Sequence, residues 1–296
     1  MEKLYQHNRL LSDAEIDTIL EREIYPRYFS GITAPSSQPQ LIYIAGQPGS
    51  GKSTREQHYT DALNAHEPHT AISINCDDMR QYHPLFLQLQ HDDDITAAIK
   101  INPDNARFTS RLIQRSYETG CHVVLEGTFR DTNSVENTAE KYRKHNYAVR
   151  AQVLAVHPLI SRVGVLGRYL KERKIYGVGR YTLPSAHDTT VYNLPHTVED
   201  FIHKGYGSEL SIINRENQTL FSYTADCETD HKSTAKAAQA TLKYHHTRPL
   251  TPEEYLFAQH SLDECIDLTL HDTTVPTAAI DEVLALKQQL EKSLSL

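Results

Sequence analysis

A glycine-rich segment is the part of this chain whose residue types and spacing point most directly to chemistry. Residues 46–53 follow the pattern G-x-x-x-x-G-K-S, in which glycines let backbone N–H groups converge on phosphate oxygens. The lysine can bridge the β- and γ-phosphates of a nucleotide, and the serine hydroxyl can hold Mg²⁺. The residues expected at the nucleotide are Gly46, Gln47, Pro48, Gly49, Ser50, Gly51, Lys52, Ser53 and Thr54, with Ser53 on the metal. The segment therefore predicts a nucleoside triphosphate site.

The surroundings of this loop support the same interpretation. The apolar run 41–45 before it is typical of a buried strand, and residues 55–63 after it are compatible with a helix. A strand, a phosphate loop and a helix start in this order are the context that the motif requires. The alternative is a glycine-rich turn that matches by chance, and the flanking elements disfavour it.

Charged side chains also follow two β-branched runs further along the chain. Asp77 and Asp78 come after the run 70–75, where either carboxylate could act as a base near a γ-phosphate. Glu126 ends the next run, where it could hold Mg²⁺ or its water. The residues expected to contact a substrate are Arg80, Thr128 and Arg130. Each segment could instead cap a helix, but two such segments beside one phosphate loop favour a functional site.

A basic segment follows inside an otherwise acidic chain. Its members are Arg162, Arg168, Lys171, Arg173, Lys174 and Arg180. Arginines in this place can close as a lid and neutralise the charge on a transferring phosphoryl group. Gly177 and Gly179 give hinge-like freedom just before Arg180. A solvated helix face is the alternative interpretation.

The composition limits what else the chain can be. Its 296 residues, 39% of them hydrophobic, suit one large α/β domain with appendages. A net charge of −8 disfavours a general nucleic-acid binder. We expect a cytoplasmic protein without membrane contact, because no signal peptide or long apolar run occurs and the cysteines lack C-x-x-C spacing. These cysteines are Cys76, Cys121, Cys227 and Cys265. The 17 histidines follow no metal-binding pattern.

Strands and helices alternate through residues 40–225, with a further strand expected at 149–156 and a hairpin at 210–223. This alternation predicts an α/β fold, a P-loop kinase-like, mostly parallel sheet flanked by helices, with ligands at the carboxyl ends of the strands.

Helical appendages are expected on both sides of this core. In residues 1–39, Ser12 and Glu15 mark the start of a helix that Pro26 ends or bends. In residues 226–296, a helix begins after Thr251. A last helix has an apolar stripe that serves core packing or partner docking, formed by Ala279, Val283, Leu286, Leu290 and Leu294.

In combination these motifs resemble the zeta toxin family of bacterial toxin–antitoxin systems. The resemblance rests on residues 46–54, 75–84 and 125–130 with Arg168 and Arg180, and it covers about residues 12–225. It implies an enzyme that uses ATP and Mg²⁺ to phosphorylate the 3′-hydroxyl of the amino sugar of UDP-N-acetylglucosamine or a related UDP-sugar. The product blocks peptidoglycan precursor synthesis.

The resemblance also implies roles for individual residues. Asp77 matches the family's catalytic base, Lys52 and Ser53 match the ATP and Mg²⁺ residues, and Arg168 and Arg180 match a pair that clamps the phosphates. Glu126, Thr128 and Arg130 match substrate-side positions. The surroundings of the base differ, because the family usually has an acidic and a small residue where this chain has Asn75 and Cys76, and often serine at Asp78. A small helical antitoxin that blocks ATP entry is the implied partner.

Other functions remain open at this point. A kinase of another small molecule, of the antibiotic or nucleoside type, would use the same loop, base and lid. An ATP-switched binding protein would turn over ATP without regard to a small acceptor. A polynucleotide kinase is disfavoured by the acidic charge and the lack of a basic, aromatic-lined groove.

Overall fold

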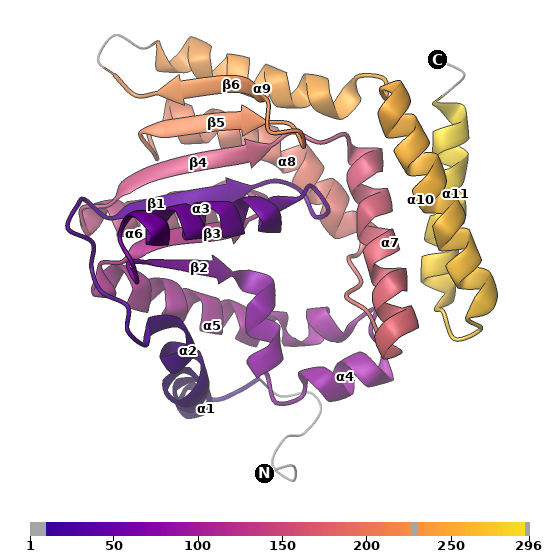
Figure 1. Cartoon of the computed structure of the whole chain (residues 1–296), viewed down its shortest axis with the longest axis horizontal. Helices are drawn as coiled ribbons and strands as arrows, with labels where there is room; N and C mark the ends of the chain where they lie inside the picture. The colour runs from indigo at the N-terminus through magenta and orange to yellow at the C-terminus, as the bar shows by residue number, and fades with distance from the viewer. Residues whose placement is uncertain (1–9, 227–229, 294–296) are drawn as a thin grey trace.

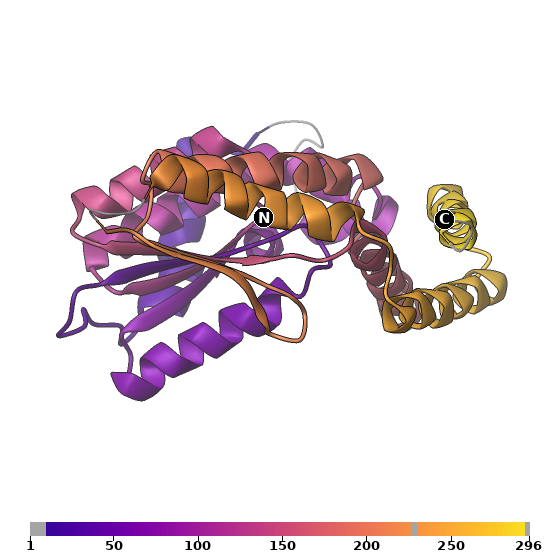
Figure 2. The ribbon, with the colours of Figure 1, turned by 90° about the horizontal axis from the view of Figure 1, so that it is seen from above.

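The structure, a computed structural model, describes residues 10–226 and 230–293 and has a sheet between helical layers (Figures 1 and 2). Cys227 and Leu294, which the sequence analysis names, lie outside the described residues. The described strands are β1 (Gln40–Ala45), β2 (Ala71–Asn75), β3 (His122–Gly127), β4 (Ala148–Leu154), β5 (Glu209–Ile213) and β6 (Thr219–Thr224). Their order is β2-β3-β1-β4-β5-β6, and all neighbours are parallel except the β5–β6 hairpin. The mostly parallel α/β architecture is therefore confirmed.

Two hydrophobic cores lie on the two faces of this sheet. Along β1, Leu41 and Tyr43 belong to one core and Ile42 and Ile44 to the other, as the alternation of a strand requires. The first core is covered by α1 (Asp13–Ile19), the π-helical turn η2 (Leu20–Ile24), α2 (Tyr25–Phe29), α5 (Ala97–Thr119), α6 (Thr132–Lys144), α8 (Pro184–His203) and α9 (His231–Thr247). The second is covered by α3 (Lys52–His66), α7 (Pro158–Tyr176), α10 (Pro252–His271) and α11 (Thr277–Lys292). Burial on both faces explains the continuous apolar strands.

The N-terminal helix packs against α5 and contributes to the first core. Ser12 and Glu15 form the expected capping box, and Ile16 is buried in the first core. Of the two outcomes expected at Pro26, an end of the helix is wrong, because helical structure continues through α2. The irregularity precedes the proline as the π-helical turn η2, and Pro26 lies in the first turn of α2.

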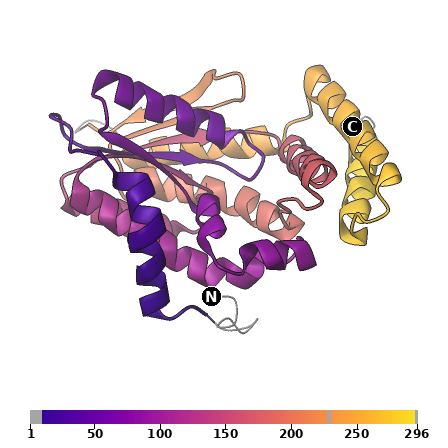
Figure 3. The same ribbon diagram turned by 60° about the horizontal axis from the view of Figure 1, so that its bottom comes forward.

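The C-terminal helices α10 and α11 form a pair that packs beside α7, away from the sheet (Figures 1 and 3). Thr251 caps α10 with Glu254 in a second capping box. The expected apolar stripe of α11 is buried in the second core at Ala279, Val283, Leu286 and Leu290. Of the two interpretations given for this stripe, the structure therefore shows packing. No helix among the described residues is long and apolar enough to cross a lipid bilayer.

Candidate active site

The glycine-rich segment forms a phosphate-binding loop between β1 and α3. Gly51 caps α3 in a left-handed conformation with φ 98°, and Gly49 has φ 80°. A Cβ at Gly49 would collide with the carbonyl of Ser161 on α7, so only glycine lets the loop approach this helix. The side chain of Gln47 fixes the loop by donating to the backbone carbonyl of Val156 at 2.6 Å.

Glu126, at the carboxyl end of β3, is the residue around which the loop side chains gather. Its carboxylate lies 3.6 Å from Lys52 Nζ and accepts a hydrogen bond from Ser53 Oγ at 3.1 Å. Asn75, its register partner on β2, donates to it at 3.2 Å. Ser53 and Glu126 offer adjacent oxygen donors of the kind that Mg²⁺ prefers, so these residues fit the expected metal.

Lys52 is the most enclosed charged group of the site. Burial lowers the pKa of Lys52, and the nearby carboxylates of Glu126 and Asp77 oppose that shift. Its ammonium also donates to the carbonyl of Gln47 at 3.2 Å. The loop, β3 and the segment after β2 thus bring one cation and two anions into electrostatic contact.

Asp77 is the second residue of the 3₁₀-helical turn η3 (Cys76–Tyr82), which precedes α4 (Phe86–Asp92). The cap of η3 is Asn75, whose side chain accepts from the backbone N–H of Asp77 at 2.9 Å. The Asp77 side chain is therefore not the cap that the alternative interpretation required, and it is about half exposed. Arg80, expected to contact a substrate, pairs with Asp77 at 2.6 Å in this structure.

Thr128 and Arg130 follow β3 beside Glu126. Between them, Phe129 takes a left-handed conformation with φ 50° and packs edge-on against Tyr43 with ring centroids 5.1 Å apart. The carbonyl of Arg130 accepts a hydrogen bond from Asn193 of α8. A buried aromatic residue at positive φ is unusual. The packing of Phe129 therefore fixes the backbone that carries Thr128 and Arg130. The cap of the next helix is Asp131 and not Thr128.

The structure divides the basic segment into two groups. Arg162, Lys171 and Arg173 form ion pairs with Glu282, Glu264 and Asp94, and Lys174 lines a cavity between α7 and α10. Arg180 pairs with Glu172 of α7 at 3.0 Å, and both Arg168 and Arg180 lie within electrostatic reach of Asp77. Burial lowers the pKa of Arg168, and the positive charge of Arg180 adds to this shift, although part of the Arg168 side chain reaches solvent. These two arginines are the members of the segment that the fold brings to the candidate site.

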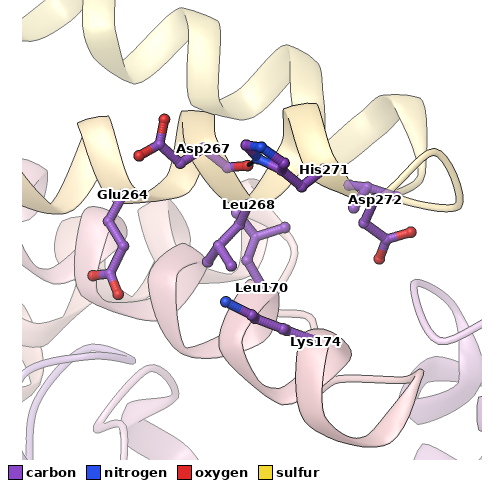
Figure 4. Close-up of a pocket in the computed structure, with 8 residues that line it drawn as sticks. Leu170, Lys174, Glu264, Asp267, Leu268, His271 and Asp272 are labelled. Carbon is purple, nitrogen blue, oxygen red and sulfur yellow. Dashed lines mark hydrogen bonds between the residues drawn. The ribbon is translucent and has the colours of Figure 1, made fainter.

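The cavity between α7 and α10 is separate from this site. It has a volume of about 450 Å³ and is lined by none of the predicted site residues (Figure 4). Leu170 and Leu268 face one another across it, with Lys174, Glu264 and Asp267 at its edge.

Two residues at the site were missed by the sequence analysis. Glu56 is buried, hydrogen bonds with Ser73 and lies beside Glu126; burial raises the pKa of Glu56 to about 8. Its spacing of four residues from Lys52 on one helix face is the signal that could have found it. Arg215, in the β5–β6 hairpin, donates to the carbonyl of Gly49 at 2.6 Å, and no local pattern marks it.

The sheet order, the phosphate loop and the charged strand ends define the class of protein: an α/β protein with a P-loop kinase-like fold. The chain belongs to the zeta toxin family, whose model matches residues 27–226. It is 29% identical to toxin zeta of Streptococcus pyogenes over 219 residues, which cover 69% of this chain and 74% of that protein. It is 23% identical to toxin PezT of Streptococcus pneumoniae over 236 residues, covering 78% and 87%.

Solved structures show the same fold. A structure from the PezAT chromosomal toxin–antitoxin system of Streptococcus pneumoniae superposes with a TM-score of 0.71 and 19% identity, covering 89% of this chain and 99% of that one. A chain of the AvrRxo1-ORF1:-ORF2 complex gives a TM-score of 0.54 at 10% identity, covering 89% and 94%. This likeness shows the fold, and the family match supports a phosphotransferase.

Proposed function

We propose that this chain is an ATP-dependent kinase that phosphorylates the 3′-hydroxyl of the amino sugar of UDP-N-acetylglucosamine or a related UDP-sugar. It acts in the cytoplasm as a zeta-type toxin by blocking peptidoglycan precursor synthesis. The observation that carries the proposal is the gathering of Lys52 and Ser53 around Glu126, within electrostatic reach of Asp77. Membership in the zeta toxin family supports the choice of acceptor.

Asp77 is the proposed general base. A sugar hydroxyl is a weak nucleophile at neutral pH, so a carboxylate that orients it and takes its proton late in the displacement accelerates transfer. Arg80, paired with Asp77 at 2.6 Å, fixes the direction of this carboxylate. Arg80, Glu126, Thr128 and Arg130 are the residues proposed for the sugar nucleotide.

Lys52, Arg168 and Arg180 supply positive charge to the transferring phosphoryl group. Such charges contribute most when they are positioned before the reaction, because no reorganisation is then needed in the transition state. Mg²⁺ held by Ser53, with Glu126 as a ligand or through water, would neutralise further phosphate charge. The residues from Gly46 to Thr54 hold the ATP phosphates.

A small helical antitoxin is the proposed protein partner. The support comes from the relatives, one of which has been characterised as part of a toxin–antitoxin system. Binding by such a partner is expected to compete with ATP, and displacement of a fluorescent ATP analogue from the purified chain by the added antitoxin would measure it.

The kinase proposal is tested with purified chain, ATP, Mg²⁺ and a panel of UDP-sugars. We expect ADP formation that depends on one acceptor and a product heavier by one phosphoryl group, with Asp77→Ala as the inactive control. ADP formation that ignores every small acceptor would contradict the proposal and favour the ATP-switched binding protein. Acceptor dependence with an antibiotic or nucleoside, but with no UDP-sugar, would favour the other kinase class.

A further inference from the structure

Arg180 lies between two residues that are each held by a buried carboxylate. The backbone N–H of Gly179 donates to Asp94 at 2.9 Å, and the hydroxyl of Tyr181 donates to Glu282 at 2.7 Å. Asp94 is 6% and Glu282 is 8% exposed, so both bonds are shielded from water. The segment expected to act as a free hinge is therefore anchored on both sides of its arginine.

Asp94 also holds the helix that carries Arg168. Its carboxylate accepts from the hydroxyl of Tyr169, the next residue along α7, at 3.0 Å, and from Arg173 at 2.6 Å. A Cβ at Gly179 would collide with the carbonyl of Tyr169, so the segment after α7 lies directly on that helix. One buried carboxylate thus fixes the neighbours of both arginines.

The second anchor belongs to the C-terminal helix pair. Glu282 is on α11, and its other oxygen accepts from Arg162 near the start of α7 at 3.2 Å. Arg173 also donates to the carbonyl of Thr274 in the α10–α11 turn at 3.0 Å. Burial and the Glu282 carboxylate raise the pKa of Tyr181, so its hydroxyl remains a donor at neutral pH.

Other parts of the same interface are less specific. The cavity at Leu170 and Leu268 interrupts the apolar contact between α7 and α10 (Figure 4), and the Lys171–Glu264 pair is largely exposed. Exposed pairs of this kind contribute little to stability. The buried bonds to Glu282 and Thr274 therefore add specific polar contacts to the apolar packing of the helix pair on α7.

We propose that Glu282 and Tyr181 are positioning residues for Arg180, and that the C-terminal helix pair, which lies beyond the matched family region at residue 226, serves to hold the two-arginine clamp in place. This inference rests on the proposed role of Arg168 and Arg180 in phosphoryl transfer. It assigns the C-terminal segment a task in catalysis in addition to packing.

The activity test is a double-mutant cycle with Tyr181→Phe, which removes one hydroxyl and no apolar contact. We expect kcat to fall about fivefold to tenfold, with the KM for ATP changed less than about twofold. In an Arg180→Ala background the same substitution is expected to have no further effect on the residual single-turnover rate. Glu282→Gln should behave like Tyr181→Phe, and Glu264→Gln, in the same interface, should match the wild-type protein.

The second readout does not need activity. Hydrogen exchange at the amides of Gly179 and Arg180 should be faster in Tyr181→Phe and Glu282→Gln than in the wild-type protein or Glu264→Gln. If hydrogen exchange changes in the variants but the chain phosphorylates no acceptor, the positioning role stands and the kinase proposal is wrong. Unchanged hydrogen exchange together with an unchanged kcat would overturn the inference. An equal loss of rate from Tyr181→Phe in the wild-type protein and in the Arg180→Ala variant would also overturn it. A fully active Arg180→Ala would remove the clamp on which it rests.

Discussion

The hydroxyl of Ser53 donates to Glu126 across 3.1 Å, although 73 residues separate them along the chain. The bond links the first turn of α3 to the carboxyl end of β3. Because β1 and β3 pair in parallel with Ile44 opposite Glu126, a loop leaving β1 passes beside this carboxylate. The phosphate loop and the acidic strand end therefore form one site whose parts can be altered separately.

The adjacent carboxylates Asp77 and Asp78 should differ sharply in importance. Asp77→Ala is expected to lower the rate of phosphoryl transfer by on the order of 10²–10⁴-fold, because a positioned base is lost. Asp78→Ala should keep a measurable fraction of the activity. ADP formation with the preferred UDP-sugar measures both, and an inactive Asp78→Ala beside an active Asp77→Ala would show that the base has been assigned to the wrong residue.

Substitutions of Lys52 and Glu126 should change the kinetics of phosphoryl transfer in different ways. Lys52→Ala is expected to abolish transfer, since it removes the buried cation of the phosphate site. Glu126→Gln keeps the shape of the side chain but not its charge, and should lower kcat by on the order of 10²-fold while raising the Mg²⁺ concentration needed for half-maximal rate. Titration of Mg²⁺ at saturating ATP distinguishes the two, and an unchanged Mg²⁺ requirement in Glu126→Gln would argue against its place beside the metal.

Glu56 should make the stability of the ligand-free protein depend on pH. Its folded pKa of about 8 exceeds the ordinary value of 4.5, so between these values the folded state binds a proton that the unfolded state lacks. Its contribution is therefore fully present below the ordinary value and is lost as pH rises toward about 8, by at most about 1.4 kcal/mol per pH unit.

Glu56→Gln removes this dependence. Relative to the wild-type protein, the variant should become more stable as pH rises through this range, and chemical unfolding at several pH values measures the difference. Glu140→Gln, at an exposed position of α6, is the control and should follow the wild-type curve. Parallel curves for Glu56→Gln and the wild-type protein would place the Glu56 pKa near its ordinary value.

The apolar stripe of α11 should be needed for stability. Leu286→Ala is expected to destabilise the protein by about 2–5 kcal/mol, because the side chain is 1% exposed and the substitution leaves a cavity. Leu284→Ala changes a half-exposed leucine of the same helix and should cost far less. Denaturant unfolding compares them, and equal losses would mean that the stripe does not pack as described.

The sequence by itself determined the parts of this protein that depend on local pattern. The phosphate loop needs glycines at fixed spacing, and buried strands need short β-branched runs, so β1 to β4, the β5–β6 hairpin and the strand ends with Asp77 and Glu126 could be located. The parallel sheet followed from the alternation of strands and helices. Helices α8 and α9 were not predicted; α8 contains Pro195 within a mixed polar sequence, which obscures its periodicity.

Only the tertiary structure decided which charged side chains meet. The basic segment looked uniform, yet Arg162 and Arg173 bind buried carboxylates, while Arg168 and Arg180 lie within electrostatic reach of Asp77. Partners such as Glu282 lie more than 100 residues away from the groups they hold, and their burial depends on how α10 and α11 pack on α7. Local sequence determines propensity and spacing, whereas burial and electrostatic partners arise from contacts between distant segments.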